Sequence, residues 1–526
     1  MFVLTLPTLT LAATYYIAPN GSNAFPGTEN QPWQTLSKAN QTLTAGDTVF
    51  IKGGTYGTFV EPVNSGTAQN PITYRNFGSD LVTISGASYG VRINGKSYIT
   101  VQGINVTQCT HLLYIVNGAH HNTIASCKFS NQQNPSNWET SVISGNSQYN
   151  WIHHSEMSEG GQCSSGGSDD GSVLDIGTEG SETDLTRYNL LENNTFFHGG
   201  HHVVGLYAGY NTVRNNYLHN EGWSRGKGNR TLYLNGRNAI TGHNVIEGNR
   251  FGYAAAPCDA QTVGNVAMST PYNLFRFNML YHHNAYGLGT YSYSGYSSGS
   301  YNKIYNNTIF NSGTNIDPAF NNGSENTAIT FLHPTNTGNK LHNNLYFSNF
   351  QVYRGFTSNQ TFSNEWNGDI QGNPLFVNAS VTPPADKSNS SLPNLNLTAA
   401  SPAINKGGAL TTVASADSGS GTSLVVTDAG YFQDGTYAPP GTSQADWIAV
   451  GSVGNVVQIA SINTQANTLI LATSIDRNDG DSIWLYKKSD GGRVLYGPAP
   501  DPGASEFSGT ADTLAPAAPV NLRIKP

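Results

Sequence analysis

One pattern of nine residues recurs along the middle of the chain. The second residue is Asn in all eight copies, the fourth and ninth residues are always apolar, and the seventh is Asn in six of the eight. The copies are HNTIASCKF (121–129), YNWIHHSEM (149–157), YNLLENNTF (188–196), YNTVRNNYL (210–218), HNVIEGNRF (243–251), YNLFRFNML (272–280), YNKIYNNTI (301–309) and GNKLHNNLY (338–346). Alternate residues of a β-strand point to the same face, so each copy predicts a strand whose fourth residue faces a core.

The spacing of the copies predicts stacked coils. The invariant Asn residues from Asn122 to Asn302 lie 28, 39, 22, 33, 29 and 29 residues apart, so a fixed strand is followed by loops of variable length. A helical solenoid would show a period near 3.6, and a propeller would have longer and more uniform repeats. The seventh-position Asn is expected at a turn, bonded to its counterpart one coil away. We therefore predict an all-β right-handed parallel β-helix, clearest from roughly residue 90 to residue 380.

Composition agrees with a solenoid and excludes other classes. The chain has 526 residues, of which 11% are charged and 58 are Gly, which suits short strands joined by tight turns. A solenoid of this length grows by adding coils instead of thickening one core. The net charge of −8 argues against a nucleic-acid partner. No run of 18 apolar residues predicts a membrane span.

Both the N-terminus and the cysteines bear on where the protein works. Residues 1–13 resemble the apolar and small-residue parts of a signal peptide without its basic region, and the alternative is an apolar lead-in strand. Export would place the protein outside the cell, where disulfides persist. The four cysteines then allow a Cys109–Cys127 pair, a Cys163–Cys258 pair, or buried free thiols.

Both ends of the solenoid carry recognisable segments. The opening TYYIAPNGSNAFPGTENQPWQTLSKANQTLTAGDTVFIKGGTYG (14–57) and the closing SPAINKGG (401–408) and PDPGASEF (500–507) resemble those of secreted bacterial right-handed parallel β-helix proteins of the pectate-lyase-like superfamily. The resemblance spans roughly residues 14 to 508. It implies a carbohydrate-active protein. It leaves the reaction open, because this superfamily holds lyases, hydrolases, epimerases and non-enzymes.

The two closing segments are separated by a stretch with its own strand pattern. We expect a β-helix over 14–409, a small β-barrel or sandwich inserted at 410–488, a closing segment at 489–508 and a Pro/Ala-rich linker tail at 509–526. The inserted domain either caps the solenoid, whose open end exposes strand edges, or binds sugar.

Loop lengths predict a cleft. The coil that begins at Asn189 is the shortest, and the coils that begin at Asn150 and Asn211 are long, so two walls flank a low floor. The floor carries the HGGHH segment of residues 198–202. One wall, 159–179, is acidic, and the other, 219–230, is basic with one Trp. Solvated loops are the alternative for both walls, and transition-metal binding is an alternative for the histidines.

One set of four charged residues is expected to stabilise the fold instead of forming the functional site. Glu192, Arg214, Glu247 and Arg276 occupy the fifth position of successive repeats and alternate in sign. Opposite charges on neighbouring strands stabilise a sheet by up to about 1 kcal/mol. We expect an outward-facing ladder of ion pairs, and the alternative is a groove-facing role for Arg214.

The first functional hypothesis is an extracellular polysaccharide lyase, a monomer acting on a uronate-containing glycan. β-Elimination needs neutralisation of the carboxylate, a base for the C5 proton and a donor to the departing oxygen. Catalytic candidates are Lys227, Arg230, His202, His219 and Glu221. Substrate-binding candidates are His198, His201, Trp223, Arg225, Arg237 and His282. Candidate Ca²⁺ ligands are Asp169, Asp170 and Asp175, whose hard oxygens this ion prefers.

Two other classes remain open. A glycoside hydrolase would use two carboxylates, drawn from Asp169, Asp170, Asp175, Glu179, Glu221 and Asp259. A non-catalytic carbohydrate-binding protein would bind a glycan without forming a product. An epimerase would share the proton-abstraction step of the lyase.

Overall fold

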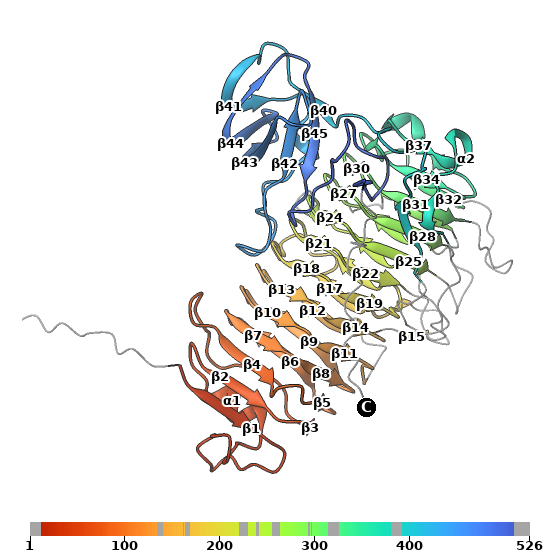
Figure 1. Cartoon of the computed structure of the whole chain (residues 1–526). Coiled ribbons are helices and arrows are strands. Elements are labelled where there is room, and N and C mark those ends of the chain that lie inside the picture. The colour runs from red at the N-terminus through yellow and green to blue at the C-terminus, as the bar shows by residue number, and fades with distance from the viewer. Residues whose placement is uncertain are drawn as a thin grey trace, which may run out of the picture.

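The protein is a parallel β-helix with a small antiparallel domain attached near its C-terminal end (Figure 1). The computed structural model describes residues 12–133, 140–160, 162–163, 169–219, 230–237, 241–254, 264–283, 285–292, 295, 297–313, 326–379 and 392–509. Each full coil contributes one strand to each of three parallel sheets. The predicted fold class is confirmed, and the coils already begin at residue 14.

The first sheet has 13 strands. They are β1 (Thr14–Ile17), β2 (Thr48–Ile51), β4 (Ile72–Asn76), β7 (Ile99–Gln102), β10 (Thr123–Ala125), β13 (Trp151–His153), β18 (Leu190–Glu192), β21 (Thr212–Arg214), β24 (Val245–Glu247), β27 (Leu274–Arg276), β30 (Lys303–Tyr305), β33 (Lys340–His342) and β36 (Thr361–Ser363). Helix α1 (Leu36–Thr42) lies beside its first strands, where Thr35 caps the helix N-terminus.

The second sheet has 12 strands. They are β3 (Gly54–Tyr56), β5 (Val82–Ser85), β8 (Ile104–Thr107), β11 (Lys128–Ser130), β14 (Glu156–Ser158), β19 (Thr195–Phe197), β22 (Tyr217–His219), β25 (Arg250–Ala254), β28 (Met279–His283), β31 (Thr308–Ser312), β34 (Leu345–Phe347) and β37 (Trp366–Asn367). Helix α2 (Gly368–Gln371) follows the last of them.

The third sheet has ten strands. They are β6 (Tyr89–Asn94), β9 (His111–Val116), β12 (Ser141–Ile143), β17 (Leu174–Ile176), β20 (Val204–Leu206), β23 (Leu232–Leu234), β26 (Val266–Met268), β29 (Tyr286–Thr290), β32 (Thr327–Phe331) and β35 (Tyr353–Gly355). A short antiparallel pair, β15 (Gln162–Cys163) and β16 (Asp169–Asp170), precedes β17. A second pair, β38 (Phe376–Asn378) and β39 (Asn394–Leu397), follows α2.

The core is a column of the apolar repeat positions. The fourth repeat residue occupies the middle of each first-sheet strand, and it is 0% exposed in Leu191, Val213 and Phe275. The ninth repeat residue lies on the second sheet and is equally buried, as in Phe196 and Leu218. The prediction that these positions face the core is confirmed.

Each repeat holds two strands where the sequence pattern predicted one. In YNLLENNTF, strand β18 ends at Glu192, the chain turns at Asn193 with a φ of 54°, and β19 begins at Thr195. The sixth repeat residue has positive φ in every copy, for example Phe277 at 55°. The left-handed conformation turns the chain sharply from the first sheet to the second, so it splits the expected strand.

Asparagine ladders run along both ends of the first-sheet strands, one at this turn and one just before each strand begins. Seventh-position side chains join coil to coil, as when Asn194 Nδ2 donates to Asn216 Oδ1 at 3.0 Å. Second-position side chains form another ladder, in which Asn150 Nδ2 donates to Asn189 Oδ1 at 2.9 Å. The predicted ladder at the seventh position is confirmed, and the second position adds its own.

The inserted domain is a six-stranded antiparallel sheet. Its strands are β40 (Thr411–Thr412), β41 (Gly419–Val425), β42 (Trp447–Val450), β43 (Val456–Asn463), β44 (Thr468–Arg477) and β45 (Ser482–Lys487). Its apolar core continues onto Val245, Leu274 and Tyr305 of the first sheet. The domain therefore lies against the flank of the solenoid, whereas a cap would lie across its open end.

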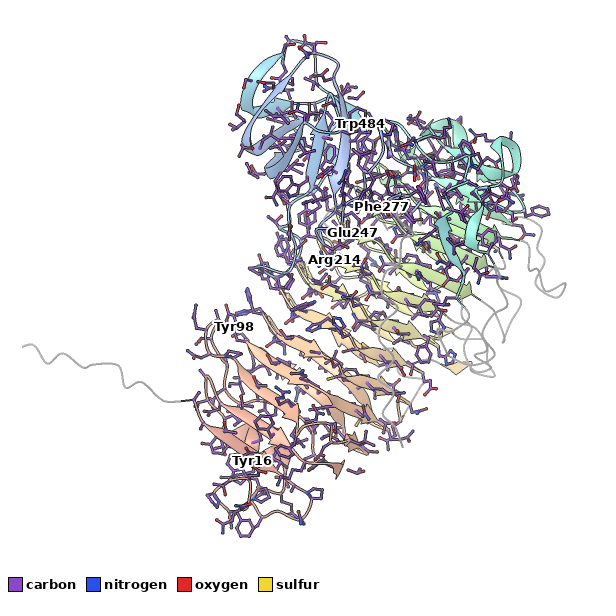
Figure 2. All side chains as sticks on the ribbon, in the orientation of Figure 1. Tyr16, Tyr98, Arg214, Glu247, Phe277 and Trp484 are labelled. Atoms are coloured by element: carbon purple, nitrogen blue, oxygen red, sulfur yellow. The ribbon has the colours of Figure 1, made fainter. Side chains whose placement is uncertain are left out.

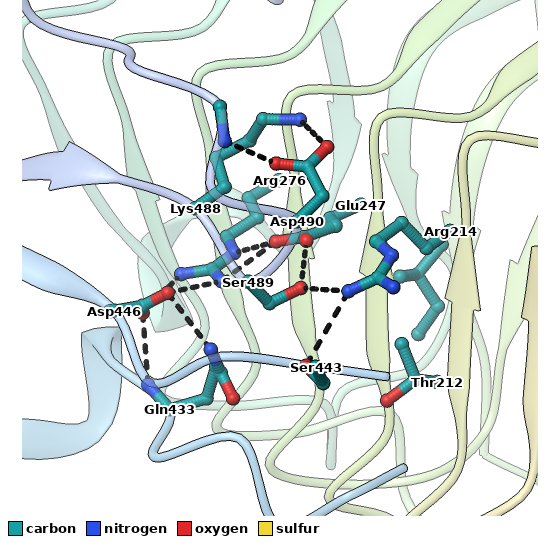
Figure 3. Close-up of polar contacts among 12 residues, drawn as sticks. Thr212, Arg214, Glu247, Arg276, Gln433, Ser443, Asp446, Lys488, Ser489 and Asp490 are labelled. Atoms are coloured by element: carbon teal, nitrogen blue, oxygen red, sulfur yellow. Dashed lines mark hydrogen bonds and ion pairs between the residues drawn. The ribbon is translucent and has the colours of Figure 1, made fainter. Parts of the chain in front are cut away.

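The predicted charge ladder forms part of the solenoid surface that the inserted domain contacts (Figure 3). Glu192, Arg214, Glu247 and Arg276 are register neighbours with ion pairs of 2.6 Å between the first two and 2.7 Å between the last two. Figure 2 places Arg214 and Glu247 where the inserted domain meets the solenoid. The ladder is thus confirmed, but it is buried and not solvated.

Several remaining expectations meet the structure only in part. Cys109 and Cys127 are buried free thiols, so the pairing of these two is wrong. The side chain of Cys163 and all of Cys258 lie outside the described residues, as do residues 1–11 and 510–526. Within the described ranges, no helix combines the length and the hydropathy needed to cross a bilayer.

Candidate functional site

A polar cluster lies on the outer face of the third sheet. Asp175 of β17, Gly205 of β20 and Tyr233 of β23 are register neighbours in three successive coils. Their strand neighbours, such as Leu174 and Leu206, are 0% exposed and point into the core. Because strand residues alternate in direction, the middle residues point outward.

Four side chains from these three coils form a continuous chain of hydrogen bonds. Asp175 Oδ1 lies 2.7 Å from His202 Nε2. His202 Nδ1 lies 3.0 Å from His201 Nδ1, and His201 Nε2 lies 3.1 Å from an Nη of Arg230. The second carboxylate oxygen of Asp175 accepts from Ser172 Oγ at 2.5 Å.

When both imidazoles are neutral, the hydrogen bonds from Arg230 to Asp175 can be assigned donors and acceptors in only one way. Arg230 can only donate, so His201 Nε2 accepts and its Nδ1 carries the proton. His201 then donates to His202 Nδ1, which leaves the His202 proton on Nε2, directed at Asp175. The chain runs from a guanidinium cation to a carboxylate anion, and Asp175 fixes the orientation of the buried His202 ring, which is 1% exposed.

Aromatic rings and one glycine hold this arrangement in place. The guanidinium of Arg230 lies 4.7 Å from the centroid of the Tyr233 ring. The Tyr233 ring also packs edge-on against His201, with centroids 5.4 Å apart. A Cβ at Gly205 would lie 2.4 Å from Asp175 Oδ1 and 2.5 Å from His202 Nε2, so only glycine leaves room for the pair.

Burial raises the pKa of two further groups beside the cluster, the Tyr207 hydroxyl and the Glu179 carboxyl. Burial first, and then the anions of Asp175 and Glu179, raise the pKa of the Tyr207 hydroxyl well above its usual value, so Tyr207 stays protonated. Burial also raises the pKa of Glu179, although His202 and Arg237 oppose this shift. Arg237 lies close by, because a Cβ on Gly180 would approach its Nε to 3.3 Å.

The predicted site residues divide among three places. Asp175, His201, His202 and Arg230 come together as described, with Arg237 beside them. His219 and His198 are buried at the second sheet, where His219 stacks between Phe197 and Tyr217. His282 lies in β28, two strands beyond β22 in the same sheet, and its Nε2 is 3.3 Å from Asn311 Nδ2. Lys227, Glu221, Trp223, Arg225 and Asp259 lie outside the described residues.

His219 is therefore separated from the cluster it was expected to join. It ends β22 on the second sheet, and its ring fills a slot between two aromatic rings with centroids 4.9 Å and 4.1 Å away. His202 reaches the third sheet because the chain turns again after β19. Sequence spacing alone treated the two histidines as neighbours along one edge.

The described residues do not assemble a calcium site around Asp175. Both of its oxygens are already engaged, one by His202 and one by Ser172. Asp169 and Asp170 are described only as backbone in β16. Within the described part of the chain, no three His, Cys, Asp or Glu side chains converge as metal ligands.

Sequence reasoning missed Ser172, Gly205, Tyr207 and Tyr233. All four lie in or next to the strand segments GSVLDIG (171–177), HVVGLYAG (202–209) and RTLYLNG (230–236). The signal was available, because aligning these segments places Asp175, Gly205 and Tyr233 in one row. The apolar pattern of these strands drew attention to the loops instead.

Comparison with known proteins agrees with the fold. Residues 15–195 match a family described as the Pel9A-like, right handed beta helix region. A segment of 99 residues, 17% of this chain, is 37% identical to the uncharacterized protein YwoF of Bacillus subtilis (strain 168) and covers 21% of it. A segment of 78 residues, 14% of this chain, is 37% identical to pectate lyase PEL9 of Emericella nidulans and covers 19% of it.

These matches are partial. The chain matches about a fifth of the length of each of these curated relatives. The solved structure of pectate lyase Pel9A superposes with a TM-score of 0.48 at 17% identity, covering 79% of this chain and 95% of that one. The family match ends before His201, His202 and Arg230, so it includes Asp175 and Ser172 but neither the histidines nor the arginine of the cluster.

Proposed function

We propose that this pectate-lyase-like right-handed parallel β-helix is a carbohydrate-active enzyme that cleaves a uronate-containing polysaccharide by β-elimination. The proposal rests on one observation, the 3.1 Å contact between Arg230 and His201 Nε2. It places a cation for the substrate carboxylate directly beside a nitrogen base.

The geometry of a uronate explains why this adjacency matters. Its C5 is bonded to the carboxylate carbon, so a carboxylate held by Arg230 brings the C5 proton near His201 Nε2. Arg230 then turns its hydrogen bonds to the substrate and releases His201 to act as the base. The C5 proton moves to His201 Nε2, the C5–H electrons form the C4=C5 double bond, the C4–O bond breaks, and the departing oxygen takes a proton from water.

The rest of the chain stabilises the proton that His201 gains. The resulting imidazolium donates through His202 toward Asp175, whose negative charge compensates the new positive charge. Asp175 is in turn fixed by Ser172, so the relay is preorganised before substrate binds. The Tyr233 ring stabilises the Arg230 guanidinium through a cation–π contact.

The test is digestion of a panel of uronate polysaccharides, including pectate, alginate and glucuronan. The lyase forms product ends that absorb ultraviolet light because of the new double bond. His201→Ala and Arg230→Lys should each lose at least about 100-fold in kcat/KM. His120→Ala, a histidine on an early coil, is the matched control. Full activity in both site variants refutes this mechanism.

A glycoside hydrolase is the second candidate, because one carboxyl group beside the cluster has a raised pKa. Burial favours protonated Glu179, and Asp175 nearby accepts hydrogen bonds as a carboxylate. Carboxyl groups with opposed environments can act as acid and base. New reducing ends without ultraviolet absorbance, lost in Glu179→Gln, would favour this function over elimination. Glycan binding with no product would favour a non-catalytic binder.

The cellular setting is part of the proposal. A polysaccharide too large to enter a cell requires an enzyme outside it, in keeping with the signal-like residues 1–13. If calcium takes part, Asp169 and Asp170 are its candidate ligands. Elimination with Arg230 neutralising the substrate carboxylate does not require calcium. Secretion by the native host and activity as a monomer are checked by fractionation and by light scattering.

A further inference from the structure

A cavity of about 320 Å³ lies at the corner between the first and second sheets, on a different face from the His202 cluster. We call it the corner cavity. Its floor is the solenoid, with Arg250 of β25 and Met279 of β28. Its other walls are the segment that returns from the inserted domain, with Arg493 and Tyr496, and the closing segment, with Glu506. Three separate parts of the chain therefore enclose one space.

Arg250 is the unusual group in this cavity. Its Nε is buried, and among the described residues none forms a hydrogen bond or an ion pair with its guanidinium. The other arginines on the outer face of the neighbouring sheet behave differently, since Arg214 and Arg276 are each paired with a glutamate. The side chain as a whole is half-buried, so its guanidinium loses part of its hydration without gaining an ionic partner, and a bound anion would supply that partner.

The remaining charges leave the cavity positive. Lys488 and Asp490 neutralise each other at 2.8 Å (Figure 3). Glu506 accepts the backbone N–H groups of Tyr496 and Asp501, and burial, followed by the charge of Asp501, raises the pKa of Glu506 above its usual range. Glu506 therefore carries less negative charge at neutral pH than an exposed glutamate does.

Arg493 adds a second cation at the rim. Its Nε donates to the Leu495 carbonyl at 2.8 Å, and its guanidinium lies 4.4 Å from the centroid of the Tyr496 ring. These contacts hold the guanidinium in one orientation over the opening. Arg250 and Arg493 thus offer two fixed cations to one ligand.

We propose that the corner cavity binds a sugar acid of monosaccharide size, with its carboxylate on Arg250. The volume lies at the lower end of the range for small-molecule sites. The amides of Asn193, Asn215 and Asn396 line the cavity and suit sugar hydroxyls, while Phe277 and Met279 give an apolar wall for a ring. An inorganic anion would use only the arginines. This site lies away from the elimination chemistry and does not rest on it.

Direct binding to the full chain tests the site. Isothermal titration with galacturonate and glucuronate should show binding, whereas galactose should bind at least about tenfold more weakly because it lacks the carboxylate. Inorganic phosphate tests charge alone. Phosphate binding as tight as that of the sugar acids overturns the proposal, because the cavity would then recognise only an anion.

Two variants assign the binding to this cavity. Arg250→Gln should weaken sugar-acid binding at least tenfold, and its melting temperature should stay unchanged because Arg250 makes no described polar contact that would be lost. Arg493→Gln should also weaken sugar-acid binding, because it removes the second cation of the cavity. Lys128→Gln, which removes one cation from an early coil, is the matched control and should bind as wild type does.

His201→Ala separates the two sites. If the corner cavity is the binding site, this variant binds galacturonate with unchanged affinity while failing in the cleavage assay. Loss of binding in His201→Ala with retention in Arg250→Gln would place the ligand at the third sheet and overturn the inference. Loss of cleavage with normal binding would leave this inference standing whatever the reaction proves to be.

Discussion

Arg276 of the solenoid and Asp446 of the inserted domain form a two-pronged ion pair that is completely buried. The two N–O distances are 2.7 and 2.8 Å, and both side chains are 0% exposed. Glu247 also contacts Arg276, so one guanidinium is shared by two carboxylates from two structural units. Gln433 donates to Asp446 as well, which completes the polar junction (Figure 3).

Asp446→Asn should destabilise the junction by about 3–5 kcal/mol, because it leaves part of the Arg276 charge without its partner. Limited proteolysis should cut near the inserted domain sooner, and the melting temperature should fall. Glu156→Gln breaks the exposed pair with Lys128 and should cost about 1 kcal/mol or less. Equal losses in the free energy of unfolding for the two variants would contradict the claim that burial makes the Arg276–Asp446 pair more important than the exposed pair.

Gly205→Ala should disable the candidate active site while leaving the fold intact. The added methyl group would overlap Asp175 Oδ1 and His202 Nε2, which displaces the relay. Displacement of catalytic groups by about 1 Å costs on the order of 100-fold in rate. The measurement is kcat/KM alongside circular dichroism. Gly57→Ala is the control, because a Cβ there meets no atom within 4 Å.

Stability should depend on pH through Glu365, which ends the seventh-position ladder. Burial raises the pKa of Glu365 to about 7, while the hydroxyls of Tyr346 and Tyr353 oppose the shift. A carboxyl whose folded pKa exceeds its unfolded value stabilises the fold below pH 4.5, and this stabilisation is lost as pH rises through 7.

Glu365→Gln should therefore remove this dependence and gain roughly 1–2 kcal/mol over wild type at pH 8. Gln360 already ends the second-position ladder in the same way, accepting from Asn339 Nδ2 at 2.9 Å. Thermal unfolding between pH 4 and pH 9 gives the comparison, with the exposed Glu29→Gln as control. A parallel pH profile for wild type and Glu365→Gln would contradict the assignment.

Chelation distinguishes how the substrate carboxylate is neutralised. If Arg230 does so, excess EDTA should change the cleavage rate by less than about twofold. A large loss that calcium restores would instead assign the carboxylate to a metal held by Asp169 and Asp170. Asp170→Asn, assayed with and without calcium, identifies that case.

The two buried thiols should resist alkylation. Burial raises the pKa of the Cys127 thiol to about 12 and also raises that of Cys109, so neither forms the reactive thiolate near neutral pH. Peptide mapping after iodoacetamide treatment should find both unmodified in the native protein and modified in urea. Native modification of Cys127 would contradict the packing of this coil.

The sequence predicted what local periodicity encodes. Leu191 and Phe196 were assigned to the core from their repeat positions, and Asp175 was placed in the same region as His202 because coils stack in register. The left-handed residue Asn193, by contrast, left no apolar signature, because Asn is common both in turns and in ladders. The two strands within each repeat were therefore read as one.

The docking of the inserted domain was beyond local reasoning. Arg276 and Asp446 are 170 residues apart, and no periodic pattern connects them. The alternation of Glu247 and Arg276 fits a solvated ladder equally well until a covering surface is known. Likewise, Arg250 appears in the sequence as one more strand cation, and only the assembled walls show that it lacks a partner.

The asparagine ladders give the solenoid a polarity. Asn244, Asn273 and Asn302 each direct their amide N–H toward the oxygen of the following coil, so every coil presents donors forward and acceptors backward. A duplicated 29-residue unit such as 273–301 would match its neighbours on both sides. Lengthening of this protein during evolution is therefore easiest by whole coils, with Gln360 and Glu365 retained as terminators.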